Sequence, residues 1–246
     1  MPSTDFGFEK VSPQEKTKRV RGVFERVDSR YDVMNDLMSL CIHRLWKHDM
    51  VNQLPLHPNA NVLDVAGGTG DISFLIHKKY RHLNLNITIC DLTPAMLEVG
   101  RNRWINQGQS QGVEWVCGNA EQLPLPDNSI DLYTIAFGLR NVTHIEQALQ
   151  EAHRVLKPGG TFVCLEFSDV KSPLLGKLYD FYSFSLLPWL GEKVANDRES
   201  YQYLVESIRR FPNQEKLVTL LKTAGMQTVS WQNFLNGISC LHIAKK

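Results

Sequence analysis

The feature that most constrains the fold of this chain is a glycine-rich turn between a buried strand and a helix. Residues 61–65 form a short apolar run typical of a buried strand, and the turn follows directly at Ala66-Gly67-Gly68-Thr69-Gly70. Glycines at such a turn allow backbone N–H groups to approach a bound ligand closely. A helix predicted over residues 71–80 completes a strand–turn–helix unit, which is typical of sites for nucleotide-like cofactors.

The residues around the turn indicate which cofactor it suits. A dinucleotide site uses GxGxxG; here Gly68 and Gly70 match, but Ser73 occupies the position of the third glycine. A phosphate-binding P-loop needs a lysine after its last glycine, where this chain has Asp71, a carboxylate that suits a cationic ligand. Asp91, about 20 residues beyond the turn, can accept hydrogen bonds from ribose hydroxyls. This pattern predicts S-adenosylmethionine, which has a ribose, a sulfonium and an ammonium group but no phosphate.

Asn119 follows the third predicted strand and is a further candidate for the cofactor site. Its side chain can offer both hydrogen-bond donors and acceptors to the edge of an adenine. An asparagine after a strand is more often a simple turn residue. Because ligands of open α/β sheets bind outside the carboxyl ends of the strands, we expect Asn119 to lie near Asp91 and the glycine turn.

The order of elements along the chain predicts the fold class. Strands and helices alternate, and a final pair of strands surrounds Asn236-Gly237, a strong hairpin signal. The helix over 145–156 has apolar residues at helical spacing, and Thr143 with Glu146 fits a capping box at its start. We therefore expect an α/β, Rossmann-like, mostly parallel seven-stranded sheet with one antiparallel strand at its edge. The strands are predicted at 61–65, 85–90, 113–117, 130–137, 161–167, 227–233 and 238–244.

Two segments depart from this alternation. Residues 1–53 have helical and mixed character, and Pro55 and Pro58 mark a linker after them. Residues 171–212 are rich in Leu, Tyr and Phe and then in charged residues, which indicates an inserted helical cap. We therefore expect an N-terminal helical cap over 1–53 and a cofactor-binding domain over 54–246 with a helical insertion at about 171–212.

Composition excludes several other classes of function. The net charge of +1 gives no broad attraction to nucleic acid, and the five widely spaced cysteines fit neither a disulfide framework nor a zinc site, so no metal is expected. The first ten residues lack a signal-peptide core, and the longest apolar stretch, around 181–191, is too short to cross a bilayer. We expect a cytoplasmic protein whose membrane contact, if it has any, is peripheral, at the inner face.

The chain resembles the ubiquinone/menaquinone biosynthesis C-methyltransferases, a family of class I methyltransferases. The resemblance covers nearly the whole chain, and two of its stretches are specific to this family: Phe137-Gly138-Leu139-Arg140-Asn141 and Val194-Ala195-Asn196-Asp197. It implies transfer of a methyl group from S-adenosylmethionine to a ring carbon of a polyprenylated benzoquinol or naphthoquinol. Further matching stretches are Tyr31-Asp32-Val33-Met34-Asn35-Asp36, Ile42-His43-Arg44-Leu45-Trp46-Lys47 and residues 63–71, 153–160 and 206–209.

The resemblance also implies where the cofactor is held. The expected contacts are the turn, Asp91, Asn119 with Ala120, and the end of the fourth strand at Ala136. The family often has Ser at that last position, so a hydroxyl contact is lost here whereas a backbone contact survives. Cys41 likewise stands where a glycine is common. The turn residues expected in contact are Gly67, Gly68, Thr69 and Gly70.

Methylation of a ring carbon needs an electron-rich ring, and a quinol is far more nucleophilic as its phenolate. Arg140 and Asn141 are the first candidates: Arg140 to stabilise the phenolate or orient a water, and Asn141 to hold a ring oxygen. The alternative for Arg140 is a surface ion pair. Tyr31 is placed over the acceptor or is a packing residue, and His43 is a base or a structural contact. Glu166 is a further candidate base.

Several alternatives stay open. The aromatic stretch from Tyr179 to Trp189 suits a polyprenyl tail or ordinary packing of the cap. Rival functions are methylation of another small lipophilic acceptor, a nicotinamide oxidoreductase, which Ser73 disfavours, and a non-catalytic scaffold of a quinone-biosynthesis complex. Membership of such a complex and a homodimer are further expectations that the sequence leaves open.

Overall fold

The computed structural model describes residues 3–27, 42–108, 112–186 and 198–246. Tyr31, Cys41 and the stretch 194–197 therefore lie outside the described residues, as do Asp32 and Asn35.

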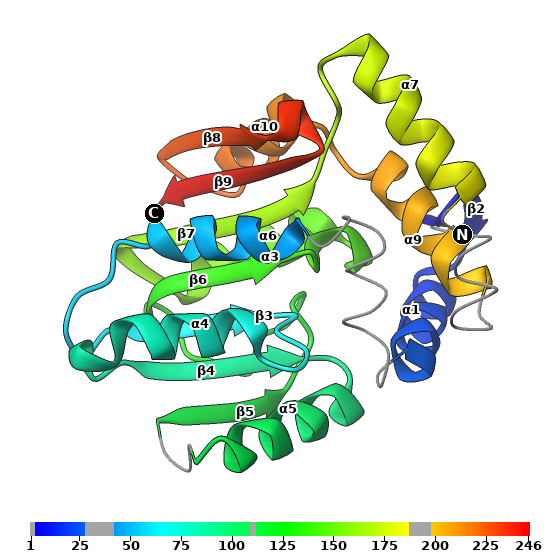
Figure 1. Ribbon diagram of the computed structural model, residues 1–246. Coiled ribbons are helices and arrows are strands. Elements are labelled where there is room, and N and C mark those ends of the chain that lie inside the picture. Colours follow the sequence, from blue (N-terminus) through cyan, green and yellow to red (C-terminus); the bar gives the residue numbers. More distant parts are fainter. Residues whose placement is uncertain (1–2, 28–41, 109–111, 187–197) are drawn as a thin grey trace.

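A seven-stranded sheet forms the centre of the molecule, in the order β5-β4-β3-β6-β7-β9-β8 (Figure 1). The first five of these strands are parallel, and β9 is antiparallel to both of its neighbours. The predicted antiparallel strand is thus β9, but it lies one strand inside the edge because the hairpin places β8 outside it. The strands are β3 (Asn61–Val65), β4 (Asn86–Asp91), β5 (Val113–Cys117), β6 (Ile130–Ala136), β7 (Leu156–Phe167), β8 (Thr228–Phe234) and β9 (Ser239–Lys245).

Helices cover both faces of the sheet, because the parallel strands are apolar on both sides. On one face Val62, Leu132 and Val163 pack with α3 (His43–Asn52), α4 (Asp71–Tyr80) and α5 (Pro94–Asn106). On the other face Leu63 and Tyr133 pack with α6 (Ile145–Val155) and α10 (Gln214–Thr223). None of the helices in the described part of the chain is long and apolar enough to span a membrane.

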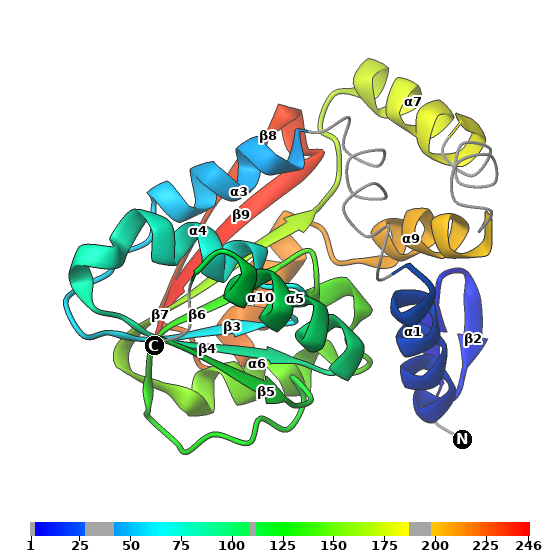
Figure 2. The same cartoon turned by 60° about the horizontal axis from the view of Figure 1, so that its bottom comes forward.

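A cap lies beyond the carboxyl ends of the parallel strands (Figures 1 and 2). It combines the N-terminal hairpin β1 (Thr4–Phe6) and β2 (Glu9–Val11), helix α1 (Pro13–Val27), α7 (Pro173–Phe181) and α9 (Arg198–Arg210). Helix α3, which falls within the N-terminal segment, instead packs on the sheet beside α4, where the Trp46 ring contacts the rings of Phe137, Phe167 and Phe234. The domain division at residues 53/54 stays a prediction.

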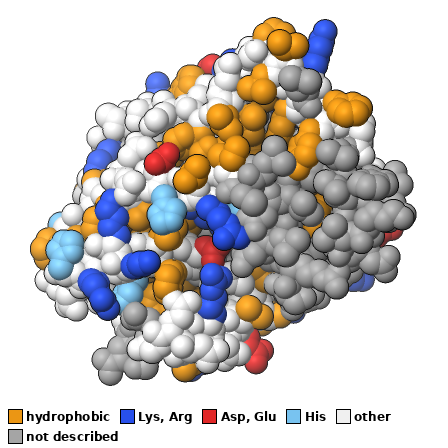
Figure 3. Space-filling model, in the orientation of Figure 1, with side chains coloured by type: hydrophobic (Ala, Val, Ile, Leu, Met, Phe, Trp, Pro, Cys, Tyr) orange, Lys and Arg blue, Asp and Glu red, His pale blue; other side chains and the backbone are white. Residues whose placement is uncertain are grey.

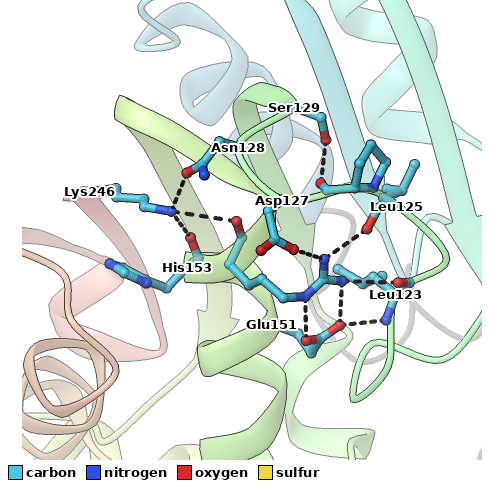
Figure 4. A network of polar contacts seen from close by, with 10 residues as sticks. Leu123, Leu125, Asp127, Asn128, Ser129, Glu151, His153 and Lys246 are labelled. Atoms are coloured by element: carbon cyan, nitrogen blue, oxygen red, sulfur yellow. Dashed lines mark hydrogen bonds and ion pairs between the residues drawn. The ribbon is translucent and has the colours of Figure 1, made fainter.

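At the end of the sheet away from the cap, polar contacts join the end of α6 to the connection between β5 and β6 and to Lys246 (Figure 4). Arg154 of α6 donates to the carbonyl oxygens of Leu123 and Leu125 and pairs with Asp127 and Glu151. It therefore fixes the connection between β5 and β6 at the end of the sheet away from the cap. This gives the stretch 153–160 a structural function.

The buried carboxylate of Asp64 holds the strand and the helix on either side of the glycine turn. Asp64 of β3 is 1% exposed and accepts hydrogen bonds from the Ser73 hydroxyl at 2.8 Å and the Thr134 hydroxyl at 2.9 Å. Ser73 thus stands at the third glycine position because its side chain ties α4 to β3. Burial raises the pKa of Asp64 from 3.8 to about 6, although these hydrogen bonds act in the opposite direction.

The raised pKa of Asp64 predicts a pH-dependent stability. The ionised form is disfavoured in the folded state, so its cost is absent below pH 3.8, where the carboxyl is protonated in both states, and complete above about 6. As pH rises from 4 to 7, the free energy of unfolding of the wild type should fall relative to Asp64→Asn by roughly 2–2.5 kcal/mol. Urea unfolding of both proteins across this range measures the difference; a difference that does not change with pH would contradict the assignment.

Candidate cofactor and active site

A cavity of about 810 Å³, open to solvent, lies at the carboxyl ends of β3, β4, β5 and β6, with α1 of the cap as its outer wall (Figure 2). This is the position at which open α/β sheets bind ligands. The lining residues come from five segments: Val65, Ala66 and Gly68; Asp91, Leu92, Thr93 and Met96; Gly118 to Glu121; Phe137, Gly138 and Asn141 to Thr143; and Thr17, Val20 and Arg21 of α1.

Only Gly68 of the four predicted turn residues lines the cavity. Its φ of +55° is in the left-handed region, which glycine adopts without strain. Gly67 and Gly70 are packed from behind: a Cβ atom would lie 2.7 Å from the Ile89 side chain at Gly67 and 3.0 Å from the Trp115 ring at Gly70. The Thr69 carbonyl faces α5. These three residues therefore shape the turn, and Gly68 presents it to a ligand.

Asp91 is held at the cavity by the backbone around it. One carboxylate oxygen accepts from the Gly68 N–H at 2.9 Å and the other from the Thr93 N–H at 2.8 Å. Burial raises the pKa of Asp91, and these hydrogen bonds oppose the shift. A carboxylate has about four lone-pair sites, so both oxygens keep capacity for the two hydroxyls of a ribose.

The ends of β5 and β6 complete the predicted cofactor contacts. Asn119 and Ala120 line the cavity, and the Asn119 carbonyl oxygen of the side chain accepts from the Glu121 N–H at 3.0 Å. Ala136 ends β6 but does not line the cavity; its neighbours Phe137 and Gly138 do. At Gly138 a Cβ atom would lie 2.5 Å from that of Ala66, so the turns after β3 and β6 touch directly.

The charged groups of the lining fit S-adenosylmethionine. Among the described residues they are Asp91, Glu121 and Arg21, with no lysine, so this part of the lining has two carboxylates and one guanidinium. This balance suits a ligand with cationic groups and no phosphate. The described residues also contain no group of three or more His, Cys, Asp or Glu side chains arranged to hold a metal ion.

Asp71 is not among the charged residues of the lining, although the sequence pattern predicted that its carboxylate would suit a cationic ligand. Its carboxylate pairs with Lys47 at 2.9 Å and with Arg103 at 3.0 Å, behind the glycine turn. His43 lines a separate hollow with these three residues and is 4% exposed. Figure 3 shows basic and histidine side chains gathered on this face, which α3 and α4 form. The structure therefore does not bring His43 to the cavity.

Arg140 is buried and does not line the cavity. Its Nη1 donates to a Glu166 carboxylate oxygen and to the Phe137 carbonyl, both at 2.6 Å. The two side chains of the pair are 2% and 1% exposed, so this is a buried ion pair and not the alternative surface pair, and a contact of Arg140 with a phenolate stays a prediction. Glu166 also accepts from the Phe167 N–H, and its carboxylate is therefore committed to structure and not free as a base.

Asn141 does line the cavity. It ends the short 3₁₀ turn η3 (Leu139–Asn141), whose backbone is fixed through Arg140: the Arg140 N–H donates to Glu166 at 3.3 Å. The predicted pair is thus divided between two roles. Arg140 holds the turn, and Asn141 faces the ligand space. Tyr31, the third catalytic candidate, lies outside the described residues.

Sequence reasoning missed the contribution of α1. Thr17, Val20 and Arg21 form the outer wall, and α1 is held there because Lys16 donates to the Val142 carbonyl at 2.8 Å and the Thr17 hydroxyl contacts that of Thr143 at 3.0 Å. Val20 and Val23 are apolar, buried and three positions apart, and this helical spacing was the available signal.

Glu121 was also missed, and it replaces the predicted capping box. The first residue before α6 is His144, and neither Thr143 nor Glu146 caps the helix with its side chain. Instead Glu121 accepts from the backbone N–H groups of Thr143 at 2.9 Å and His144 at 3.2 Å. The carboxylate therefore joins the end of β5 to the turn that carries Asn141.

The buried ion pair predicts non-additive effects on stability. Arg140→Met leaves the Glu166 carboxylate buried without its partner and should lower the free energy of unfolding by about 3–5 kcal/mol. In the double variant Arg140→Met with Glu166→Gln, the loss of the free energy of unfolding should be much smaller than the sum of the two single losses. Lys171→Met, which removes an exposed partner of Glu215, should cost less than about 1 kcal/mol. Full stability with lost activity in Arg140→Met would instead indicate direct contact with an acceptor.

The position of Asp91 predicts its effect on cofactor binding. Asp91→Asn should weaken S-adenosylmethionine about 10- to 100-fold, because it removes hydrogen bonds to a charged acceptor. Asp131→Asn is the matched control: Asp131 accepts from the Asn61 N–H and pairs with Lys157 at the other end of the strands. Calorimetric titration measures both dissociation constants, and an unchanged value for Asp91→Asn would remove Asp91 from the site.

Comparisons with solved structures bear out the fold. A SAM-dependent methyltransferase of Thermotoga maritima superposes with a TM-score of 0.61 at 22% identity, over 92% of this chain and 99% of that one. A SAM-dependent methyltransferase of Aquifex aeolicus gives a TM-score of 0.57 at 17% identity, over 96% and 98% of the two chains. The predicted Rossmann-like class I methyltransferase fold is confirmed.

Sequence comparisons identify the family. The mitochondrial 2-methoxy-6-polyprenyl-1,4-benzoquinol methylase of Mus musculus is 48% identical, over 97% of this chain and 83% of its own length. The enzyme of the same name from Oryza sativa subsp. japonica is 47% identical, over 99% and 88%. A family model described as the ubiE/COQ5 methyltransferase family matches residues 12–246. The chain therefore belongs to the ubiE/COQ5 methyltransferase family and is a methyltransferase whose cofactor is S-adenosylmethionine.

Proposed function

We propose that this enzyme methylates a ring carbon of a 2-polyprenyl-6-methoxy-1,4-benzoquinol in ubiquinone biosynthesis. The observation that carries the proposal is the likeness, at 47–48% identity over nearly the whole chain, to proteins named for methylation of this quinol. The cavity supports it, because the expected cofactor contacts Gly68, Asp91 and Asn119 share one lining with Asn141 and apolar wall residues.

The chemistry assigns distinct tasks to the lining. When bound, S-adenosylmethionine supplies an electrophilic methyl group on a positively charged sulfur. Asp91 orients the ribose, and the apolar side chains of Val20, Met96 and Phe137 exclude water, which favours a transfer that removes charge. The phenolate of the acceptor would push an electron pair into the ring, and the ring carbon would bond to the methyl group as the sulfur–methyl bond breaks and leaves neutral S-adenosylhomocysteine. Loss of the ring proton to water would then restore the aromatic ring.

The position of the acceptor follows from the two sides of the cavity. With the cofactor along the ends of β3, β4 and β5, the ring lies between Asn141 and the α1 wall. Asn141 would hold a ring oxygen next to the carbon that is methylated. Positioning of this kind supplies a large part of the rate in a transfer between two bound molecules.

The polyprenyl tail leaves the cavity through the cap. Leu174, Phe181 and Phe184 are exposed, at 72%, 70% and 44% of their surface, and they suit an apolar chain. Contact with a membrane would be peripheral in this arrangement. Membership of a biosynthetic complex, a homodimer and a cytoplasmic location, with any membrane contact at the inner face, stay proposals; the relatives are named as mitochondrial proteins.

Transfer of labelled methyl to short-tailed demethylated quinols tests the proposed reaction. Under reducing conditions the benzoquinol should take up carbon-linked label, and a demethylated naphthoquinol, the acceptor of menaquinone biosynthesis, is tested beside it. Asp91→Asn should lose most of the transfer, whereas Asp131→Asn should keep it. If the wild type binds S-adenosylmethionine and methylates neither quinol, the acceptor assignment fails and the cofactor site stands.

A further inference from the structure

Asn141 is in contact with a buried tyrosine of the cap. The Tyr203 hydroxyl of α9 donates a hydrogen bond to Oδ1 of Asn141 at 3.2 Å. The two residues are 62 positions apart in sequence, and the contact joins the cap to the turn after β6. The same Asn141 side chain lines the cofactor and acceptor cavity.

Tyr203 is held rigidly in place. It is 4% exposed, and its ring stacks on that of Phe6 in β1, with centroids 4.2 Å apart and planes 16° apart. The hairpin that carries Phe6 is itself tied to α9, because the Phe8 N–H donates to Glu206 at 2.9 Å. Burial raises the pKa of Tyr203 well above its ordinary value of 10.0, so the hydroxyl keeps its proton and remains a donor.

An asparagine side chain has one acceptor oxygen and one NH₂ donor, and the contact with Tyr203 decides which of them faces the cavity. The tyrosine hydroxyl donates to Oδ1 and so turns that oxygen toward the cap, and Nδ2, the donor of the amide, is then directed away from Tyr203. We propose that Tyr203 is a positioning residue that fixes the Asn141 amide with its NH₂ group toward the acceptor. A hydrogen bond to Oδ1 also polarises the amide and strengthens donation from Nδ2.

This orientation has a consequence for the reaction, and it rests on the proposed function. An NH₂ group can only donate, so it favours an acceptor oxygen that carries negative charge over a protonated hydroxyl. Asn141 therefore stabilises the phenolate form of the quinol, which is the nucleophilic form. Arg140 pairs with Glu166 through Nη1 and does not line the cavity, so we assign this task to the neighbouring amide.

Steady-state kinetics of Tyr203→Phe tests the proposal, because the variant keeps the ring and its stacking on Phe6. We expect kcat to fall about 5- to 10-fold, with KM for the quinol and the dissociation constant of S-adenosylmethionine within about twofold of the wild type. In the pH profile of kcat, the acid limb should move to higher pH by about 0.5–1 unit, because the bound phenolate is less stabilised. Unchanged kcat and pH profile would overturn the proposal.

A double-variant cycle and a matched control separate positioning from structure. If Tyr203 acts through Asn141, Tyr203→Phe should have no further effect on kcat in an Asn141→Ala background. A double variant in which kcat falls by the product of the two single factors would contradict this. Tyr80→Phe is the control, since it also removes one tyrosine hydrogen bond, from Tyr80 to the Val51 carbonyl at 2.9 Å, on the α3–α4 face. Its kcat should match the wild type.

A spectroscopic arm does not need turnover, so a failure of the proposed acceptor is distinguishable from a failure of this inference. In ¹⁵N-asparagine-labelled enzyme with S-adenosylhomocysteine, the Asn141 side-chain amide signal is assigned by its loss in Asn141→Ser. In Tyr203→Phe we expect this signal to shift and its hydrogens to exchange faster, whereas Tyr80→Phe should leave it unchanged. The same shift and exchange rate in Tyr203→Phe and wild type would overturn the proposal.

Discussion

The buried ion pair between Arg140 and Glu166 is the interaction on which the acceptor side of the cavity depends. Taking two charges out of water costs several kcal/mol for each ion, and only close geometry and further hydrogen bonds compensate for that cost. Here Glu166 accepts from the Arg140 guanidinium and from the backbone N–H groups of Arg140 and Phe167. The pair therefore fixes the backbone of the turn after β6 to the end of β7. Because Asn141 is the next residue, its place at the cavity follows from a contact outside the cavity lining.

The cofactor side was predictable from the sequence, because its residues follow strands and the strands of a parallel sheet end at one edge. Gly68, Asp91 and Asn119 each stand directly after a predicted strand, and the structure brings all three to one cavity. The local pattern did not separate residues that face a ligand from residues that shape the turn. That distinction depends on neighbours such as Ile89 and Trp115, which fill the space behind the glycines.

The acceptor side was less predictable, because its geometry depends on contacts between distant segments. The capping-box pattern at Thr143 was wrong, since Glu121 from the connection between β5 and β6 accepts from the backbone N–H groups of Thr143 and His144. The partner of Arg140 is 26 residues away, and nothing near Arg140 in sequence indicates a buried carboxylate. The hairpin signal predicted an antiparallel strand at the edge of the sheet. It did not indicate which strand of the hairpin pairs with β7, and β9 takes that place.

The two sides of the cavity also differ in what keeps them ordered. The cofactor side is built on the ends of buried parallel strands and on hydrogen bonds between near neighbours, such as Gly68 to Asp91. The other wall belongs to α1, which is joined to the sheet through the Val142 carbonyl and the Thr143 hydroxyl. Phe6 stacks on Tyr203, so the N-terminal hairpin and α9 order each other, and Tyr203 in turn contacts Asn141. The cofactor side is therefore ordered by the sheet itself, whereas the opposite wall is ordered by contacts between the cap and the sheet.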